Sequence, residues 1–134
     1  MPDASSILAP ISAGELIDKI TILRIKAQRV SDSAKLQNIL HELNLLEEIL
    51  ASAIAPSADL NRLTSELQRV NELLWDVEDD VRLCDRSGEF GPRFIELARS
   101  VYRHNDRRSA LKRQINELLG SRLIEEKSYR TDGK

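Results

Sequence analysis

The sequence predicts an all-α protein of four main helices, arranged as two antiparallel hairpins in an elongated helical bundle. Composition is the first reason: 41% of the 134 residues are hydrophobic and 31% are charged, with only five Gly, four Pro and five aromatic residues, which favours long helices over sheets. The second reason is a coiled-coil-like seam of apolar residues spaced by three and four, at Leu60, Leu63, Leu67, Val70, Leu74, Val77, Val81 and Cys84. This seam predicts one helix of roughly 40 Å, against which the other helices pack.

The first helix is expected to begin at Ser12, because Ser12 and Glu15 have the spacing of a capping box. Apolar residues then recur on two sides of the helix, so it is predicted to be the most buried of the four. Asp18 shares one of these sides with Ile22 and Ile25, four and seven residues further on. Its carboxylate is therefore expected to be partly desolvated and to need a partner.

Local signals divide the middle of the chain. A polar turn at residues 31–33 opens the second helix, over about 34–55, and its shortness makes the first two helices an antiparallel hairpin. Pro56 and Ser57 then begin the third helix, which runs to about Arg86. The fourth helix spans about 92–119, with a proline at its first position and a glycine just after its last.

Both ends of the chain are expected to be irregular. Residues 1–11 are predicted to form an arm, and residues 130–134 a frayed tail. Between the fourth helix and this tail, residues 121–128 are expected to form a short helix or a clasp. The whole chain, 1–134, is predicted to be a single domain.

The charge pattern argues against several classes of function. A net charge of −2 gives no general attraction to nucleic acid or to an anionic membrane. No apolar run approaches the ~20 residues of a membrane span, and no secretory leader is evident, so a cytoplasmic protein is expected. Cys84 is the single cysteine and lies on the seam, which indicates a buried thiol.

The fourth helix has a seam of its own, at Phe94, Leu97, Val101, His104, Arg108, Leu111, Ile115 and Leu118. The two polar residues in its middle, His104 and Arg108, are the strongest hint of a site. A buried guanidinium needs a carboxylate, a ligand anion or water, and the candidate internal partners are Asp18, Glu72 and Asp76. Arg108 and Lys112 could together hold a phosphate or carboxylate, with His104 or a nearby acid moving a proton. The alternative is that these polar residues only fix the register of the helices. The candidate ligand-binding residues are Asp18, Lys19, His104, Asn105, Arg108, Lys112, Glu125, Glu126, Lys127 and Tyr129.

A weaker candidate is a divalent-metal site on the third helix. Glu72, Asp76 and Asp79 are spaced by four and three residues, and their carboxylates could hold Mg²⁺. A solvated acidic face explains the same pattern. No cofactor is predicted, because the sequence has no Gly-rich phosphate loop and no Cys/His metal cluster.

Four segments together resemble a known family: GELIDKITILRIK from Gly14, NELLWDVEDDVR from Asn71, HNDRRSALKRQINELLGS from His104, and EEKSY from Glu125. The family is one of small bacterial proteins with a domain of unknown function, numbered 6165. The resemblance covers nearly the whole chain and implies a stand-alone helical domain. Because the family has no established activity, it supplies no catalytic residue.

Two functions remain open from the sequence. The first is a self-associating, non-enzymatic interaction module that also binds another protein. Two apolar sides on the first helix are expected to leave part of a stripe uncovered in a monomer, which favours a homodimer. The second is an anionic-metabolite or nucleotide site, or an enzyme, built around Arg108, Lys112 and His104. Satisfied internal ion pairs that face no cavity favour the module, whereas a pocket with converging polar groups favours the site.

Overall fold

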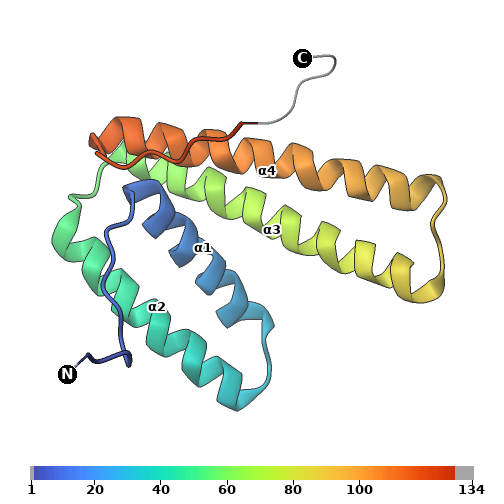
Figure 1. Cartoon of the computed structure of the whole chain (residues 1–134), viewed down its shortest axis with the longest axis horizontal. Coiled ribbons are helices and arrows are strands. Elements are labelled where there is room, and N and C mark those ends of the chain that lie inside the picture. Colours follow the sequence, from blue (N-terminus) through green and yellow to red (C-terminus); the bar gives the residue numbers. More distant parts are fainter. Residues whose placement is uncertain (1, 129–134) are drawn as a thin grey trace.

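The computed structural model describes residues 2–128, which form four helices and no strand. The helices are α1 (Ala13–Arg29), α2 (Ser33–Ala53), α3 (Ala58–Ser87) and α4 (Pro92–Leu119). Figure 1 shows α1 and α2 as one antiparallel hairpin and α3 and α4 as a second, longer one. The predicted all-α class and the two hairpins are confirmed, and α4 has the predicted bounds.

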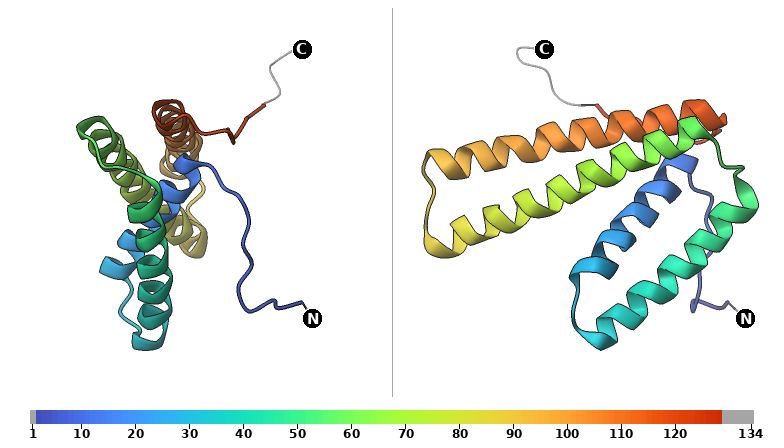
Figure 2. Two further views of the ribbon diagram at one scale, coloured as in Figure 1. Left: turned by 90° about the vertical axis from the view of Figure 1, so that its left-hand side faces the viewer. Right: turned by 180° about the vertical axis from the view of Figure 1, so that it is seen from behind.

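The two hairpins meet at one end and diverge at the other (Figures 1 and 2). Helix α1 packs against all three other helices, whereas α2, among the described residues, packs against α1 alone. One apolar cluster joins Ile17 of α1 to α3 and α4, and a second joins Leu16, Ile20 and Leu23 to α2. Apolar residues on two sides of α1 are therefore covered, as predicted, but they are covered within the described part of the chain itself. The expectation that a single chain leaves part of an apolar stripe of this helix exposed is wrong.

The start of α1 lies very close to α4. The backbone N–H of Gly14 donates to Asn116 Oδ1 at 2.7 Å. A Cβ atom on Gly14 would lie only 2.5 Å from the backbone oxygen of Lys112. Glycine is therefore required at this position because the two helix backbones nearly touch.

The predicted capping box at the start of α1 forms only in part. Ser12 Oγ accepts from the backbone N–H of Glu15 at 3.1 Å, as expected. The Glu15 carboxylate instead reaches across to Lys112 on α4. A contact with another helix therefore replaces half of the local motif.

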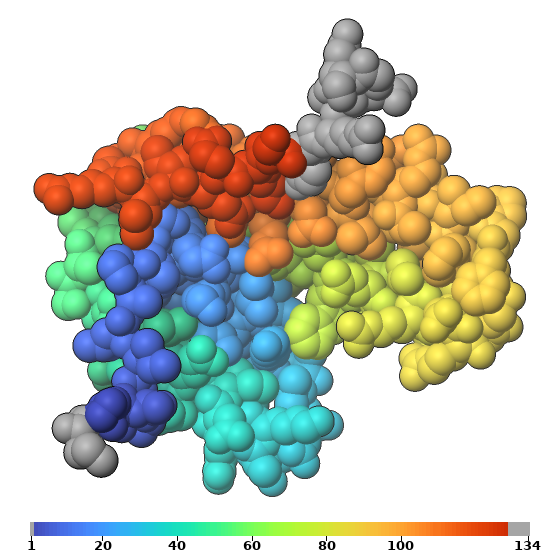
Figure 3. Space-filling view, in the orientation of Figure 1, coloured from blue at the N-terminus to red at the C-terminus, as the bar shows by residue number. Residues whose placement is uncertain are grey.

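The chain after α4 turns back along that helix. Gly120 has a φ of 65° and ends α4, after which residues 121–128, here called the strap, contain no helix. The clasp alternative is therefore the correct one for this segment, and Figures 1 and 3 show it beside α4. Leu118, predicted on the seam, is 43% exposed, and Leu119 packs on the core in its place.

Other expectations can be compared directly with the structure. Cys84 is a buried free thiol, as predicted. Residues 2–11 form no helix, as expected for an arm, whereas Tyr129 and residues 130–134 lie outside the described part of the chain. None of the helices in residues 2–128 is both long enough and apolar enough to span a membrane.

Candidate functional site

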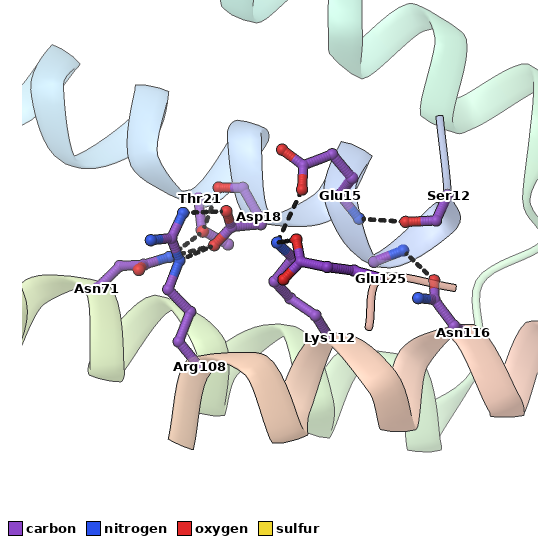
Figure 4. A network of polar contacts seen from close by, with 10 residues as sticks. Ser12, Glu15, Asp18, Thr21, Asn71, Arg108, Lys112, Asn116 and Glu125 are labelled. Carbon is purple, nitrogen blue, oxygen red and sulfur yellow. Dashed lines mark hydrogen bonds and ion pairs between the residues drawn. The ribbon is translucent and has the colours of Figure 1, made fainter. Parts of the chain in front are cut away.

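The centre of the site is an ion pair between α1 and α4. Asp18 is fully buried, and its Oδ1 and Oδ2 accept from Arg108 Nε at 2.9 Å and from Arg108 Nη2 at 2.5 Å, respectively. The guanidinium thus binds the carboxylate through two parallel hydrogen bonds (Figure 4), the strongest arrangement for this pair of groups. Of the three internal partners predicted for Arg108, Asp18 is the correct one.

Two further buried polar groups complete the surroundings of Asp18. Asn71 of α3 donates from Nδ2 to Asp18 Oδ1 at 3.0 Å and to Thr21 Oγ1 at 2.9 Å. The Thr21 hydroxyl donates in turn to the backbone oxygen of Asp18. Neither Thr21 nor Asn71 was predicted from the sequence as a site residue. The only signal was that the Asn71 amide directly follows Val70 in the apolar seam of α3.

Lys112 forms a second ion-pair centre, one turn along α4 from Arg108. Its ammonium donates to Glu15 Oε2 at 2.7 Å and to Glu125 Oε1 of the strap at 3.1 Å, and its side chain is only 8% exposed. Burial by itself lowers the pKa of Lys112, but the hydrogen bonds to Glu15 and Glu125, together with the negative charges of Asp18 and Glu15, outweigh burial and raise it. The hydrogen bonds to Asp18 likewise raise the pKa of Arg108, so both cations stay charged.

Arg108 and Asn105 lie between two cavities of about 240 Å³ each. The first, the polar cavity, lies beside the strap and is lined by Glu15, Asn105, Arg108, Ser109, Lys112, Glu125 and Lys127. The second, the Trp75 cavity, lies among α1, α3 and α4 and is lined by Ile22, Ile25, Lys26, Asn71, Leu74, Trp75, Glu78, Asn105 and Arg108.

The structure therefore brings together most of the predicted ligand-binding residues. Three of the predicted residues lie elsewhere: Lys19 is exposed and faces α2, His104 is half-buried and lines neither cavity, and Glu126 pairs with Arg113 on the surface. The tenth predicted residue, Tyr129, lies outside the described residues.

The predicted acidic metal site has a different set of contacts. Asp76 pairs with Arg29 of α1, and the Arg29 guanidinium also lies over the ring of Trp75. Among residues 2–128, no group of three or more His, Cys, Asp and Glu side chains is arranged to hold a metal ion.

The polar groups of the site are satisfied within the described part of the chain. No buried side-chain nitrogen or oxygen there lacks a hydrogen-bond partner. Such a saturated network fixes the positions of α1, α3, α4 and the strap relative to one another. The satisfied ion pairs are what an interaction module was expected to have, whereas the two cavities lined by polar groups are what a ligand site was expected to have.

The family comparison covers almost the entire chain. A model of a family of unknown function matches residues 7–133, which include the second half of the arm, all four helices and the strap. No curated protein and no solved structure matches the chain. Since the match extends over far more than half of the sequence, this protein belongs to the family of unknown function DUF6165.

Proposed function

We propose that this protein is a non-enzymatic interaction module that self-associates through α2 and the N-terminal arm. The supporting observation is that α2 has many large aliphatic residues but buries few of them. Its eight large aliphatic residues are Leu36, Ile39, Leu40, Leu43, Leu45, Leu46, Ile49 and Leu50, of which Leu43 alone is buried in the single chain.

A helix with one neighbour needs one apolar stripe, and its other side is normally polar. Among the described helices, α2 contacts only α1, and Leu45 and Ile49 lie outside the stripe that faces α1 and line a groove beside the arm. They are nevertheless 47% and 43% exposed, so the arm leaves much of this additional apolar surface uncovered in the isolated chain. It is what a helix that packs against a further protein would carry.

The arm adds a second exposed apolar element beside α2. Ile7 and Leu8 are 79% and 93% exposed, and with α1 and α2 the arm encloses a groove of about 580 Å³ (blue segment in Figure 3). The surface therefore has an apolar strip next to an apolar groove. A two-fold axis would place the strip of each copy in the groove of the other, which is the self-complementarity that a symmetric dimer requires.

The exposed area is of the right size for such a contact. The exposed parts of Ile7, Leu8, Ile11, Leu45 and Ile49 amount to ~500 Å² per copy, against the roughly 800 Å² of mixed surface per partner in a stable interface. An apolar share of about 60–65% is typical of homodimer interfaces. A second copy is therefore the occupant that we assign to the groove.

Sedimentation velocity of the wild type and the Leu45→Glu/Ile49→Glu double variant tests the proposal. We expect a dimer for the wild type and a folded monomer for the variant, because two charges in the groove would have to be desolvated. The matched control is Leu83→Glu/Ile95→Glu, which changes two equally exposed aliphatic residues of α3 and α4 and should leave the dimer intact. A monomeric wild type at all concentrations would overturn self-association, and dissociation by the control pair alone would overturn the assigned surface.

A further inference from the structure

The two cavities that meet at Arg108 and Asn105 differ in chemistry. The polar cavity is surrounded by charged and hydrogen-bonding side chains, whereas the other has Trp75, Ile22 and Leu74 in its wall. Each is open to the outside of the single chain, and the two adjoin at Arg108 and Asn105, which line both. A ligand with a polar end and an apolar body would match this pair.

The polar cavity already holds a carboxylate, that of Glu125. Glu125 and Glu15 share the ammonium of Lys112, but they differ in attachment. Glu15 belongs to α1, whose start is docked on α4, and lies 2.7 Å from the ammonium. Glu125 belongs to the strap, which has no regular secondary structure, and lies 3.1 Å away. Glu125 is therefore the partner that can be exchanged.

The charge balance favours a monoanion in place of Glu125. In the polar cavity the Lys112 ammonium is shared by the Glu15 and Glu125 carboxylates. A ligand carboxylate that replaces Glu125 on Lys112 leaves this balance of charge unchanged when the Glu125 side chain turns outward. A phosphate dianion in the same place would leave an extra negative charge in a largely desolvated site, which is unfavourable.

The Trp75 cavity is large enough for the apolar body of such a ligand. Its volume of about 240 Å³ exceeds the ~150 Å³ of an apolar cavity that binds benzene. We propose that the two cavities form one binding site for a small carboxylate with an aromatic or branched apolar body, and that Glu125 occupies the carboxylate position in the free protein. Self-association through α2 is not required for this site.

Phenylacetate is a suitable probe, and the protein has its own reporter. Trp75 is the only tryptophan in the sequence, so its fluorescence monitors the apolar half of the site directly, and calorimetry gives the affinity. We expect binding to the wild type, and binding to Glu125→Gln that is roughly tenfold tighter or more, because the competing ionic hydrogen bond is gone. Glu126→Gln is the matched control, since Glu126 is the adjacent strap acid and pairs with exposed Arg113.

Control ligands that lack one of the two features of phenylacetate distinguish this proposal from general anion binding. Acetate lacks the apolar body, and benzyl alcohol lacks the charge. In mildly alkaline buffer inorganic phosphate is mainly a dianion and also lacks the apolar body, so each of the three should bind at least tenfold more weakly than phenylacetate. Absence of phenylacetate binding to both the wild type and Glu125→Gln overturns the site. Equal enhancement in Glu126→Gln, or equal binding of phosphate, overturns the role assigned to Glu125 and the choice of ligand.

Discussion

Replacing Arg108 by Met should destabilise the protein more than replacing its buried partner Asp18 by Asn. In Arg108→Met, the fully buried Asp18 carboxylate keeps only Asn71 as a side-chain donor. In Asp18→Asn, an amide oxygen still accepts hydrogen bonds, and the Arg108 side chain, 30% exposed, can reach water. The loss of stability depends on which charged group is left unpaired. A fully buried carboxylate without its cation costs more than a partly exposed guanidinium without its anion.

The magnitudes follow from this asymmetry. Leaving one charge of a buried pair unpaired costs about 3–5 kcal/mol, and we expect about 3 kcal/mol for Arg108→Met, since the neighbouring cavities admit water. Asp18→Asn should cost about 1–2 kcal/mol, the usual range for a weakened buried hydrogen bond. For a chain of this length the corresponding falls in Tm are about 10 °C and about 5 °C.

Urea unfolding followed by circular dichroism, at one fixed protein concentration, measures these differences. The decisive comparison is the double variant Asp18→Asn/Arg108→Met, which should be more stable than Arg108→Met because it has no unpaired charge. Arg113→Met is the control, an exposed arginine of the same helix whose loss should change stability by less than ~1 kcal/mol. A double variant less stable than Arg108→Met would show that the unpaired Asp18 carboxylate is not the cause of the loss.

Two further predictions concern contacts of α4 with α1. Gly14→Ala should lose about 2–3 kcal/mol in the same urea assay, because its Cβ would meet the backbone oxygen of Lys112; a gain in stability would show that the helices can separate freely. The raised pKa of Lys112 in the folded state contributes stability below its unfolded value of about 10.4, which is lost as pH rises through the folded value. Above that pH the wild type should therefore lose stability relative to Lys112→Met, and parallel pH curves for the two proteins would contradict this.

The features that sequence predicted well are those set by neighbouring residues. Helix α4 begins at Pro92 and ends before Gly120, where φ is 65°, because both residues act through their own backbone geometry. The two-sided apolar pattern of α1 likewise identified the most enclosed helix. Asp18 was recognised as needing a partner because a carboxylate stood among isoleucines.

Other features, which sequence left open or missed, depend on contacts between distant segments. The sequence leaves residues 121–128 open between a short helix and a clasp, and they form the clasp, with Glu125 and Glu126 paired with Lys112 and Arg113 of α4. The same lysine draws the Glu15 carboxylate away from the predicted capping box. Local propensity carries no information on either contact.

The seam predicted for α4 lies on the buried side of the helix, but it leaves out some of the buried residues. Near its C-terminal end α4 packs against both α1 and α3, so Leu111, Lys112, Ile115 and Asn116 are all buried. In its first half only α3 lies beside it, and the predicted seam residues Phe94, Leu97 and Val101 are only half-buried. A spacing of three and four describes one contact face, and it cannot show where a second neighbour widens that face.

Helix α1 separates the two proposed surfaces, as its adjacent residues Asp18 and Lys19 show. Asp18 turns to α4 and the ion-pair network, whereas Lys19 turns to α2 and lines the groove below the arm. The sequence analysis grouped the two because both stand in a segment shared with the resembled family, but consecutive residues of a helix point about 100° apart. Assembly through α2 and ligand binding at Lys112 therefore use different sides of one helix, so each can be removed by substitution while the other is measured.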